Sequence, residues 1–349
     1  METIIAQITE NEEQNQKIYE QASDILKRGG LVAFPTETVY GLGADALDEE
    51  ASAKIYAAKG RPSDNPLIVH IADTKALEEL SCDVTAQAKL LAEKFWPGPL
   101  TMIFRKSEAV PYETTGGLDT VAVRMPSHPT ALALIRESGG YIAAPSANTS
   151  GRPSPTLAEH VYEDLNGKIP MILDGGAVTI GLESTIVDLT EEIPTILRPG
   201  FISLDMVQAV LGEAQIDRGL IANDSNIHPK APGMKYRHYA PKADLKIVEG
   251  PMEQVISYIN EQAEKGRTGI ICTEETRSRY PKGDIKCVGT RKDELSIASH
   301  LFAVLREFDE DGVEQIYSES FKAPGLGEAI MNRLLKAAGH QKVDVSDRK

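Results

Sequence analysis

Three short strings of the sequence combine hydroxyl, cationic, imidazole and amide side chains with glycine and proline. They are residues 34–43 (FPTETVYGLG), residues 59–70 (KGRPSDNPLIVH) and residues 145–148 (PSAN). Each string follows or ends a segment of strand-like composition, and ligands of open α/β sheets gather at strand ends. Together the three strings predict a pocket for a small anionic ligand.

Lys59 and Arg61 are the cations best suited to that ligand. They follow a predicted helix that Pro62 prevents from continuing, and side chains two apart in an extended segment share a face. The planar fork of arginine and the mobile charge of lysine suit phosphate oxygens. A Lys-x-Arg pair alone more often marks a solvated surface, so the prediction depends on the turns that surround it.

Thr36 and Thr38 follow the strand predicted over residues 31–34. Gly41 and Gly43 allow the chain to turn sharply after Tyr40, which would let both hydroxyls face a ligand at the strand end. The alternative is that the threonines cap a helix or pack in a strand, as most threonines do.

Two further strands are predicted to end in side chains that can do chemistry. Arg124 closes a buried type of strand, where a charge must be paired or face a cleft, so a carboxylate or phosphate is its expected partner. His70 closes another strand and is either a packed core histidine or a site residue. Ser184 and Arg198 add a hydroxyl and a fourth cation further along.

Apolar periodicity predicts an α/β scaffold for these side chains. Helices are expected over residues 12–28, 49–58, 84–95, 130–137, 157–165 and 204–211, and strands over residues 31–34, 67–71, 100–104, 121–124, 141–144, 171–173, 185–188 and 195–198. The last strands are too close together for helical crossovers, so the sheet is predicted to be mixed.

The rest of the chain predicts a linker and a second, smaller domain. Residues 212–242 are polar and turn-rich, and residues 228–242 carry cations without a single acid, so they either cover a ligand or form a solvated spacer. From residue 243 strands and helices alternate as in a doubly wound, Rossmann-like parallel sheet. The predicted domains are therefore residues 1–211 and 243–349, joined by residues 212–242.

Composition narrows the functional classes. The chain has 37 Lys plus Arg against 52 Asp plus Glu, a net charge of −15, which disfavours non-specific adhesion to nucleic acid or anionic membranes. Its 3 cysteines lack C-x-x-C spacing, and no apolar run approaches the ~20 residues of a membrane span. We predict a cytoplasmic protein without a membrane partner and without stable nucleic-acid binding. Motifs for covalent catalysis are not found.

The strings resemble the YrdC-like family, and more closely its long two-domain form, the L-threonylcarbamoyladenylate synthases. Lys59, Arg61, Ser146 and Asn148 are similar to the family's Lys-x-Arg and Ser-x-Asn tetrad. Residues 95–101 (FWPGPLT) and 231–241 (APGMKYRHYAP) resemble its other signatures, although the latter more often begins with Ser in the family than with Ala.

The resemblance implies a YrdC-like twisted mixed sheet with flanking helices, and a reaction that joins L-threonine, bicarbonate and ATP into threonylcarbamoyl-AMP and pyrophosphate. This is the first step toward the threonylcarbamoyl group on adenosine beside certain tRNA anticodons. Lys59 and Arg61 would be catalytic, with Mg²⁺ brought by ATP rather than held by side chains. The implied nucleotide-binding residues are Lys59, Arg61, Asn65, Thr120, Ser146, Asn148, Ser154, Arg198, Tyr236 and His238. The implied L-threonine-binding residues are Thr36, Thr38, His70, Arg124, Ala144 and Ser184, with Arg124 on the carboxylate.

Two other functions are compatible with parts of the sequence. One is an RNA-binding module without chemistry, which the acidic net charge disfavours. The other is a carbamoyltransferase of the hydrogenase-maturation type, whose zinc-finger modules would need cysteine clusters. The synthase reading also implies a transient partner, the downstream threonylcarbamoyl transferase machinery.

Overall fold

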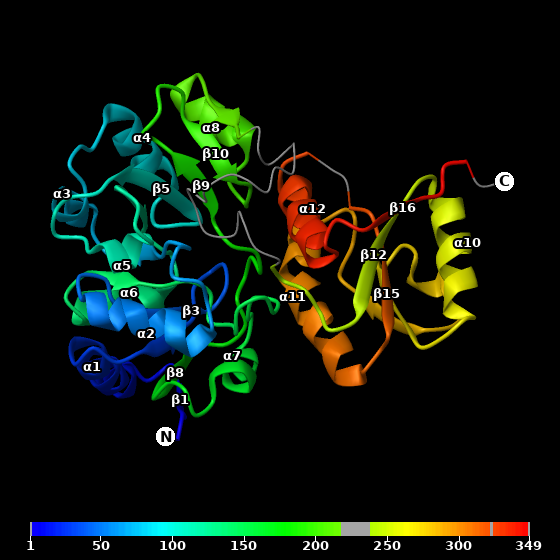
Figure 1. Cartoon of the computed structure of the whole chain (residues 1–349), viewed down its shortest axis with the longest axis horizontal. Helices are drawn as coiled ribbons and strands as arrows, with labels where there is room; N and C mark the ends of the chain where they lie inside the picture. Colours follow the sequence, from blue (N-terminus) through cyan, green and yellow to red (C-terminus); the bar gives the residue numbers. More distant parts are fainter. Residues whose placement is uncertain (1, 218–237, 322–323, 348–349) are drawn as a thin grey trace. The chain divides into compact units, whose positions relative to one another are not determined.

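The chain divides into two compact units, seen in a computed structural model that describes residues 2–217, 238–321 and 324–347 (Figure 1). The larger unit comprises Met1–Ser150, Ser154–Thr179 and Glu183–Tyr236. The smaller one comprises Arg237–Lys349 together with two short loops, Gly151–Pro153 and Ile180–Leu182. Both loops fall within residues 1–211, the predicted first domain, so the smaller unit also takes in chain from that range.

The larger unit is built on an eleven-stranded mixed sheet of order β1-β8-β2-β3-β7-β4-β6-β5-β9-β10-β11. The mixed α/β fold class predicted from the sequence is confirmed. The strands are β1 (Ile4–Gln7), β2 (Val32–Phe34), β3 (Gly41–Asp45), β4 (Ile68–His70), β5 (Leu100–Arg105), β6 (Thr120–Arg124), β7 (Ile142–Ala143), β8 (Met171–Asp174), β9 (Thr185–Asp188), β10 (Thr195–Arg198) and β11 (Gln215–Ile216).

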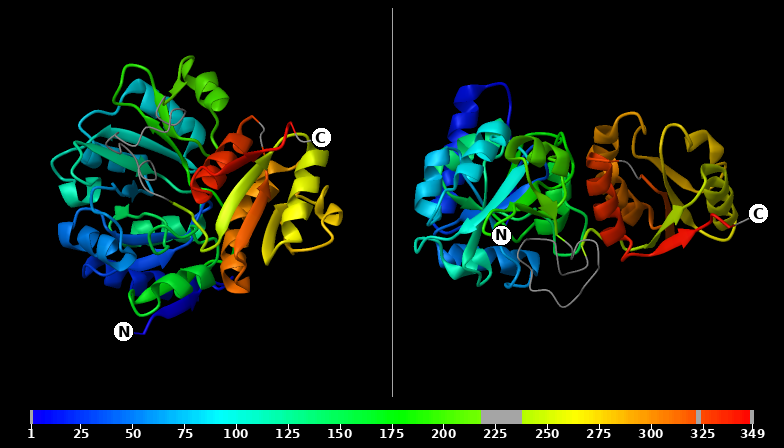
Figure 2. Two further views of the ribbon diagram at one scale, coloured as in Figure 1. Left: turned by 45° about the vertical axis from the view of Figure 1, so that its right-hand side comes forward. Right: turned by 90° about the horizontal axis from the view of Figure 1, so that it is seen from above.

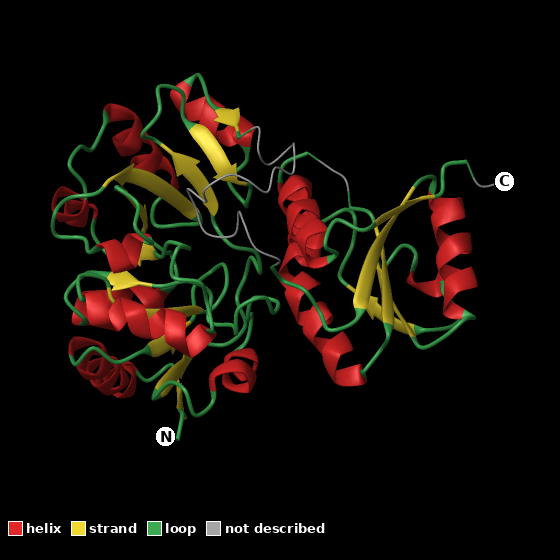
Figure 3. Cartoon of the chain, viewed as in Figure 1, coloured by secondary structure: helices red, strands yellow, loops and turns green. Residues whose placement is uncertain are grey.

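Helices flank this sheet (Figure 3). They are α1 (Glu12–Lys27), α2 (Glu49–Lys59), α3 (Leu77–Leu80), α4 (Ala86–Phe95), α5 (Tyr112–Thr115), α6 (Pro129–Glu137), α7 (Ala158–Leu165) and α8 (Leu204–Leu211), with a 3₁₀ turn at Thr74–Ala76. The longer helices start at side-chain caps, as at Asp48, whose carboxylate accepts from the N–H groups of Glu50 and Ala51. Helix α2 ends at Lys59 because Gly60 adopts the left-handed conformation, φ 62°.

Residues 41–45 form strand β3 and not the predicted sharp turn. The strand runs antiparallel to β2, with Gly43 opposite Val32 and Gly41 opposite Phe34. A Cβ on Gly43 would lie 2.8 Å from Cγ2 of Ile142 and 2.9 Å from the ring of Phe34. Glycine is therefore needed at position 43 for close packing inside a strand, and the turn falls in residues 35–40.

The smaller unit contains a five-stranded, all-parallel sheet of order β14-β13-β15-β12-β16. Its strands are β12 (Asp244–Glu249), β13 (Thr268–Cys272), β14 (Asp284–Cys287), β15 (Gln315–Glu319) and β16 (Lys342–Asp344), and its helices are α10 (Met252–Ala263), α11 (Glu294–Asp311) and α12 (Leu326–Ala337). Helix α10 covers one face of the sheet, and α11 and α12 cover the other (Figure 2). The predicted doubly wound parallel sheet is confirmed.

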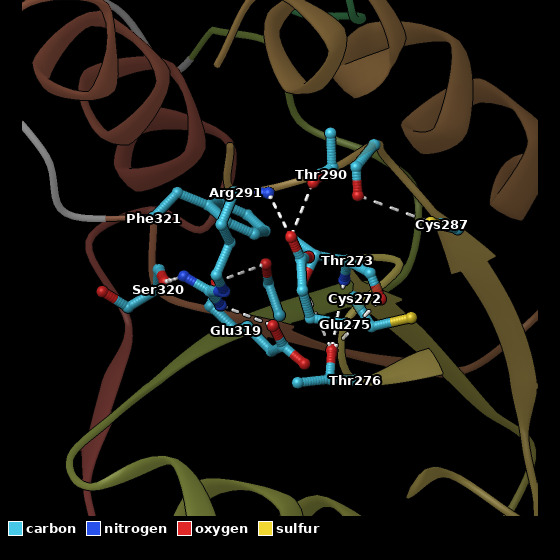
Figure 4. A network of polar contacts seen from close by, with 12 residues as sticks. Cys272, Thr273, Glu275, Thr276, Cys287, Thr290, Arg291, Glu319, Ser320 and Phe321 are labelled. Carbon is cyan, nitrogen blue, oxygen red and sulfur yellow. Dashed lines mark hydrogen bonds and ion pairs between the residues drawn. The ribbon is translucent and has the colours of Figure 1, made fainter. Parts of the chain in front are cut away.

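A polar network joins the carboxyl ends of β13, β14 and β15 (Figure 4). The carboxylate of Glu319 is 0% exposed, accepts from the hydroxyl of Tyr280 at 2.8 Å and pairs with Arg291 at 2.5 Å. Glu275 accepts from the Thr290 hydroxyl at 2.6 Å and the Arg291 N–H at 3.0 Å. A buried carboxylate needs such partners, so this network ties the three strand ends together.

No helix in the described ranges is both long and apolar enough to cross a bilayer. Within the same ranges, no group of three or more His, Cys, Asp or Glu side chains is arranged to hold a metal ion.

Candidate functional site

Backbone hydrogen bonds bring the first and third motif strings side by side. The N–H of Leu42 donates to the carbonyl of Pro145 at 2.9 Å, and the N–H of Ala147 donates to the carbonyl of Tyr40 at 2.8 Å. Tyr40 in turn donates its N–H to the carbonyl of Pro155 at 2.9 Å. Segments about a hundred residues apart in the sequence are thus held in register around Tyr40.

Lys59 connects the second string to the third. Its side chain is 1% exposed, and its Nζ donates to the backbone carbonyls of Ser146 and Asn148. The Asn148 side-chain oxygen lies 3.5 Å from Nζ and accepts from the Ser146 hydroxyl at 2.5 Å. An ammonium group has three N–H donors and no acceptor, so these carbonyl and amide oxygens fix the position of a buried cation at the start of the third string.

Arg61 is placed differently from Lys59. Because α2 ends at Lys59 and Gly60 is left-handed, the two cations do not lie in the extended segment predicted from the sequence. Arg61 is half-buried and donates to the carbonyls of Asn65 at 3.3 Å and Pro66 at 3.2 Å, within its own loop. These bonds fix the guanidinium group relative to the loop that follows α2.

Arg124 is the centre of a buried polar cluster. Its side chain is 4% exposed and donates to the Thr38 hydroxyl at 2.8 Å and the Gly98 carbonyl at 3.3 Å. It also pairs with the Glu37 carboxylate at 2.7 Å. The expected carboxylate partner therefore exists within the protein, and Glu37 is a site residue that sequence reasoning missed. As the one acid of the first string, Glu37 could have been found by asking what balances a buried arginine.

The two threonines of the first string have different tasks. The Thr36 hydroxyl donates to the carbonyl of Val39 at 2.7 Å and accepts from the Thr38 N–H at 3.1 Å, so it shapes the loop. The Thr38 hydroxyl lies 2.9 Å from that of Thr36 and accepts from Arg124. Thr36 thus fits the local structural reading of these threonines, whereas Thr38 belongs to the cluster.

His70 lies opposite Arg124 in the pairing of β4 with β6. Its Nδ1 donates to the carbonyl of Ile68 at 3.0 Å, and its ring meets that of Phe34 edge-on at 6.1 Å. Burial, reinforced by the positive charge of Arg124, lowers the pKa of His70 to about 3. The imidazole is therefore neutral at physiological pH and serves as a hydrogen-bonding group, not as a cation.

This low pKa predicts a pH dependence of stability. Below pH 6.5 the unfolded chain binds a proton at His70 that the folded chain does not bind until about pH 3, so the free energy of unfolding falls as the pH falls. Between pH 6.5 and 5 the loss is about 2 kcal/mol. We expect His70→Gln to remove this part of the slope, measured by urea unfolding at several pH values. Parallel curves for the parent and the variant would contradict the assignment.

A second cluster contains Ser184 and Arg198. Arg198 donates to the carbonyl of Ser184 at 3.0 Å and to its hydroxyl at 3.1 Å. The Ser184 hydroxyl lies 2.7 Å from that of Thr101, which is opposite Arg124 in the pairing of β5 with β6. Thr101 is another residue that sequence reasoning did not single out, and it joins the Arg198 cluster to the Arg124 cluster.

The remaining predicted residues lie around these clusters. Ser154 donates to the Glu183 carboxylate at 2.5 Å, and the N–H of Ala144 donates to Ile68 at 2.9 Å. Asn65 is 2% exposed, and in the described chain its side-chain oxygen is buried without a hydrogen-bond partner. Thr120 is half-buried at the start of β6.

Two predicted nucleotide residues come from the end of the linker. Tyr236 lies outside the described residues. His238 is described within the smaller unit, where its ring is 5.6 Å from that of Tyr239.

The site is arranged over a face of the sheet and not along one edge. Strand β7 is antiparallel to β4, so Ala144 and His70 follow opposite strand directions. Val69, Met102 and Val123 belong to the main core, and side chains alternate along a strand. His70, Arg124 and Thr101 therefore belong to the opposite face. An apolar cluster on that face contains Ile68, Ile103, Ala122, Ile186 and Leu197.

The fold and this site belong to an α/β protein whose buried cations, hydroxyls and amide lie beside an apolar cluster. Residues 24–200 match the family described as "Telomere recombination", and residues 202–339 match the threonylcarbamoyl-AMP synthase C-terminal domain. The chain is 53% identical over 321 residues to the threonylcarbamoyl-AMP synthase of Bacillus subtilis, covering 91% of this chain and 92% of the relative. It is 50% identical over 329 residues to that of Pyrococcus abyssi, covering 93% and 95%.

Comparison with solved structures indicates the same family as comparison with these relatives. P. abyssi Sua5 in complex with L-threonine superposes with a TM-score of 0.91 at 47% identity, covering 99% of this chain and 100% of that one. A double variant of the same protein gives a TM-score of 0.93, covering 99% of each chain. The chain belongs to the family of two-domain threonylcarbamoyl-AMP synthases, which are nucleotidyltransferases. It is thus an enzyme and not an RNA-binding module without chemistry, and its activity leads to threonylcarbamoyladenosine in tRNA.

Proposed function

We propose that the chain binds L-threonine at the Arg124 cluster and ATP around Lys59, Ser146 and Asn148, with both ligands over the same face of the sheet. The amine of threonine combines with bicarbonate, losing water, to give a carbamate. A carbamate oxygen then attacks the α-phosphate of ATP, the bond to the β-phosphate oxygen breaks, and pyrophosphate leaves with the electron pair. No protein nucleophile is needed, so the protein acts by positioning the reactants and balancing charge.

The threonine half of the proposal is supported by the number of N–H donors on Arg124. A guanidinium group has five such donors, and the contacts of Arg124 with Thr38, Glu37 and Gly98 use only some of them. The donors left over can take the substrate carboxylate, while Glu37 and Thr38 fix the orientation of the guanidinium group. His70, Thr36, Ser184 and the backbone at Ala144 complete this half. The relative whose title names bound L-threonine supports the ligand class.

The nucleotide half is supported by the buried ammonium of Lys59 and the unsatisfied oxygen of Asn65. A buried amide oxygen without a partner is costly, so a hydrogen-bond donor of a bound nucleotide would relieve it. We assign Lys59 and Arg61 to the triphosphate. The other assigned residues are Asn65, Thr120, Ser146, Asn148, Ser154, Arg198, Tyr236 and His238. The apolar cluster around Ile103 offers a surface for the base.

Mg²⁺ enters the proposal as a companion of ATP. The described carboxylates near the site, Glu37 and Glu183, are each engaged by a neighbouring side chain, so the residues present suit a metal ion carried by the phosphates better than one held by protein ligands. When bound, the ion would offset the negative charge of the triphosphate. The labile product is then proposed to pass to the threonylcarbamoyl transferase machinery.

The observation that carries the proposal is the contact of Lys59 with the Ser146–Asn148 segment, which joins the second string to the third. Its test is pyrophosphate release from ATP, which we expect to require L-threonine and bicarbonate together. Release without threonine would indicate a simple nucleotide hydrolase. Absence of release under all conditions would overturn the proposal.

A further inference from the structure

Glu37 and Arg124 are in contact inside the larger unit, but the contact is not a hydrogen bond. Glu37 lies in the loop between β2 and β3, and Arg124 is the last residue of β6. Oε1 of Glu37 is 2.7 Å from Nη2 of Arg124, and the two side chains are 9% and 4% exposed. In the described chain, neither of these two atoms takes part in a hydrogen bond. The opposite charges are therefore adjacent, while both atoms keep their capacity for hydrogen bonds.

The other polar atoms of the two side chains are engaged by the protein. Nη1 of Arg124 donates to the Thr38 hydroxyl at 2.8 Å, and Nε donates to the Gly98 carbonyl at 3.3 Å. Oε2 of Glu37 accepts from the N–H of Ser127 at 3.2 Å. These bonds fix both side chains and place one guanidinium nitrogen beside one carboxylate oxygen.

This pair of atoms indicates a ligand that brings an acceptor and a donor together. A buried polar atom without a hydrogen bond is costly. Nη2 needs an acceptor and Oε1 needs a donor, and such bonds are strongest when the ligand groups are charged. The α-carboxylate and the α-ammonium group of an amino acid supply both from the same carbon atom. The zwitterion is neutral, as the Glu37–Arg124 pair is, so its binding leaves no net charge buried.

We propose that Oε1 of Glu37 binds the α-amino group of the substrate while Arg124 takes its carboxylate, so that the pair selects α-amino acids. The proposal rests on the proposed function, which assigns Arg124 to the threonine carboxylate, and adds the residue that holds the nitrogen. That nitrogen forms the carbamate in the proposed reaction, so Glu37 also orients the nucleophile. An acid with a hydroxyl in place of the amine would leave Oε1 without a cationic donor.

The test compares two ligands by isothermal titration calorimetry of the full chain without ATP. The ligands are L-threonine and dihydroxybutyrate, which carries a hydroxyl in place of the amino group of threonine. The parent should bind threonine at least about tenfold more tightly. Glu37→Gln should weaken threonine binding by at least about tenfold and change dihydroxybutyrate binding by less than about threefold, because only threonine carries the ammonium group. Equal affinities in the parent, or equal losses for both ligands in the variant, would overturn the proposal.

Asp188→Asn is the matched control for Glu37→Gln. Asp188 is 2% exposed, and its carboxylate accepts from the N–H and the hydroxyl of Thr190 at 2.9 and 2.6 Å. The variant removes one buried carboxylate from the same unit, and its affinities for both ligands should stay within about twofold of the parent. A loss of threonine affinity equal to that in Glu37→Gln would attribute the effect to the removal of any buried acid and would overturn the proposal.

The double variant of Glu37→Gln with Arg124→Met separates this proposal from the proposed function. It should bind dihydroxybutyrate at least about tenfold more weakly than Glu37→Gln alone, because the ligand carboxylate has lost its guanidinium partner. Equal binding in these two variants would overturn the assignment of Arg124. A loss in the double variant, together with parent-like threonine binding in Glu37→Gln, would overturn the role of Glu37 alone.

Glu37→Asp takes the place of Glu37→Gln if the glutamine variant does not fold. It keeps the charge but moves the carboxylate back by one methylene group, so it should weaken threonine binding more than dihydroxybutyrate binding. Equal weakening of the two ligands would again overturn the proposal.

Discussion

Arg61→Ala is expected to lower kcat/KM for pyrophosphate release by about 10²- to 10³-fold, the usual cost of removing one preorganised donor that faces developing charge. The fold should persist because Arg61 is half-buried and its described hydrogen bonds go to Asn65 and Pro66 in its own loop. The free energy of unfolding should fall by no more than about 1 kcal/mol. Steady-state kinetics and urea unfolding of the same preparation check both parts.

Arg105→Ala is the matched control for Arg61→Ala. Arg105 is an exposed arginine at the end of β5, and its loss changes the net charge by the same amount. The kcat/KM of Arg105→Ala should stay within about twofold of that of the parent, because an exposed charge attracts ATP mainly over a long range, where salt screens the attraction. Equal losses in both variants would attribute the effect to general attraction of ATP, and full activity in Arg61→Ala would remove Arg61 from the site.

Arg124→Met is expected to have the largest effect on stability, a loss of about 3 to 5 kcal/mol in the free energy of unfolding. The reason is that Glu37 would remain buried as a carboxylate without its partner at 2.7 Å. Combining it with Glu37→Gln should recover much of this stability, since the double variant leaves no buried carboxylate without its partner at this position. In both Arg124→Met and the double variant, the rate of pyrophosphate release should not saturate with threonine. Both lack the Arg124 guanidinium group, which is assigned to the threonine carboxylate.

Lys265→Met provides the comparison for this pair. Lys265 and Glu261 form an i,i+4 ion pair with side chains 58% and 51% exposed, for which about 0.5 kcal/mol or less is expected. A comparable loss in Lys265→Met, or no recovery in the Glu37→Gln and Arg124→Met double variant, would contradict the buried-pair account.

The elements that the sequence predicted well are those whose side chains repeat with a clear period. Helices such as α6 and α10 bury one face against their sheet, and their apolar spacing is visible in the chain itself. Strand β3 was missed because Gly41 and Gly43 indicate a turn, whereas in the structure they make room for Phe34 and Ile142. Strand β1 was missed because it is four residues long and lacks a buried face of alternating residues.

The site was predicted as a set of residue types but not as a set of contacts. Nothing local to Lys59 indicates that its ammonium bonds to a segment 87 residues away, and the antiparallel direction of β7 could not be read from its neighbours. Glu37 and Thr101 were passed over for the same reason, since a partner acquires meaning only when the fold brings Arg124 and Ser184 beside it. The assignment of individual residues to ATP or to threonine came from the family resemblance and not from residue spacing.

The pairing of β1 with β8 has a consequence for how the chain is made. Ile4 lies opposite Met171 and Gln7 opposite Asp174, so during translation the first strand waits, without its neighbour, until more than 160 further residues have left the ribosome. Such distant pairings close late, since loop closure must precede the contacts that reward it. Ile4 and Ile5 stay open to a chaperone throughout that interval, and they are still 57% and 43% exposed after pairing.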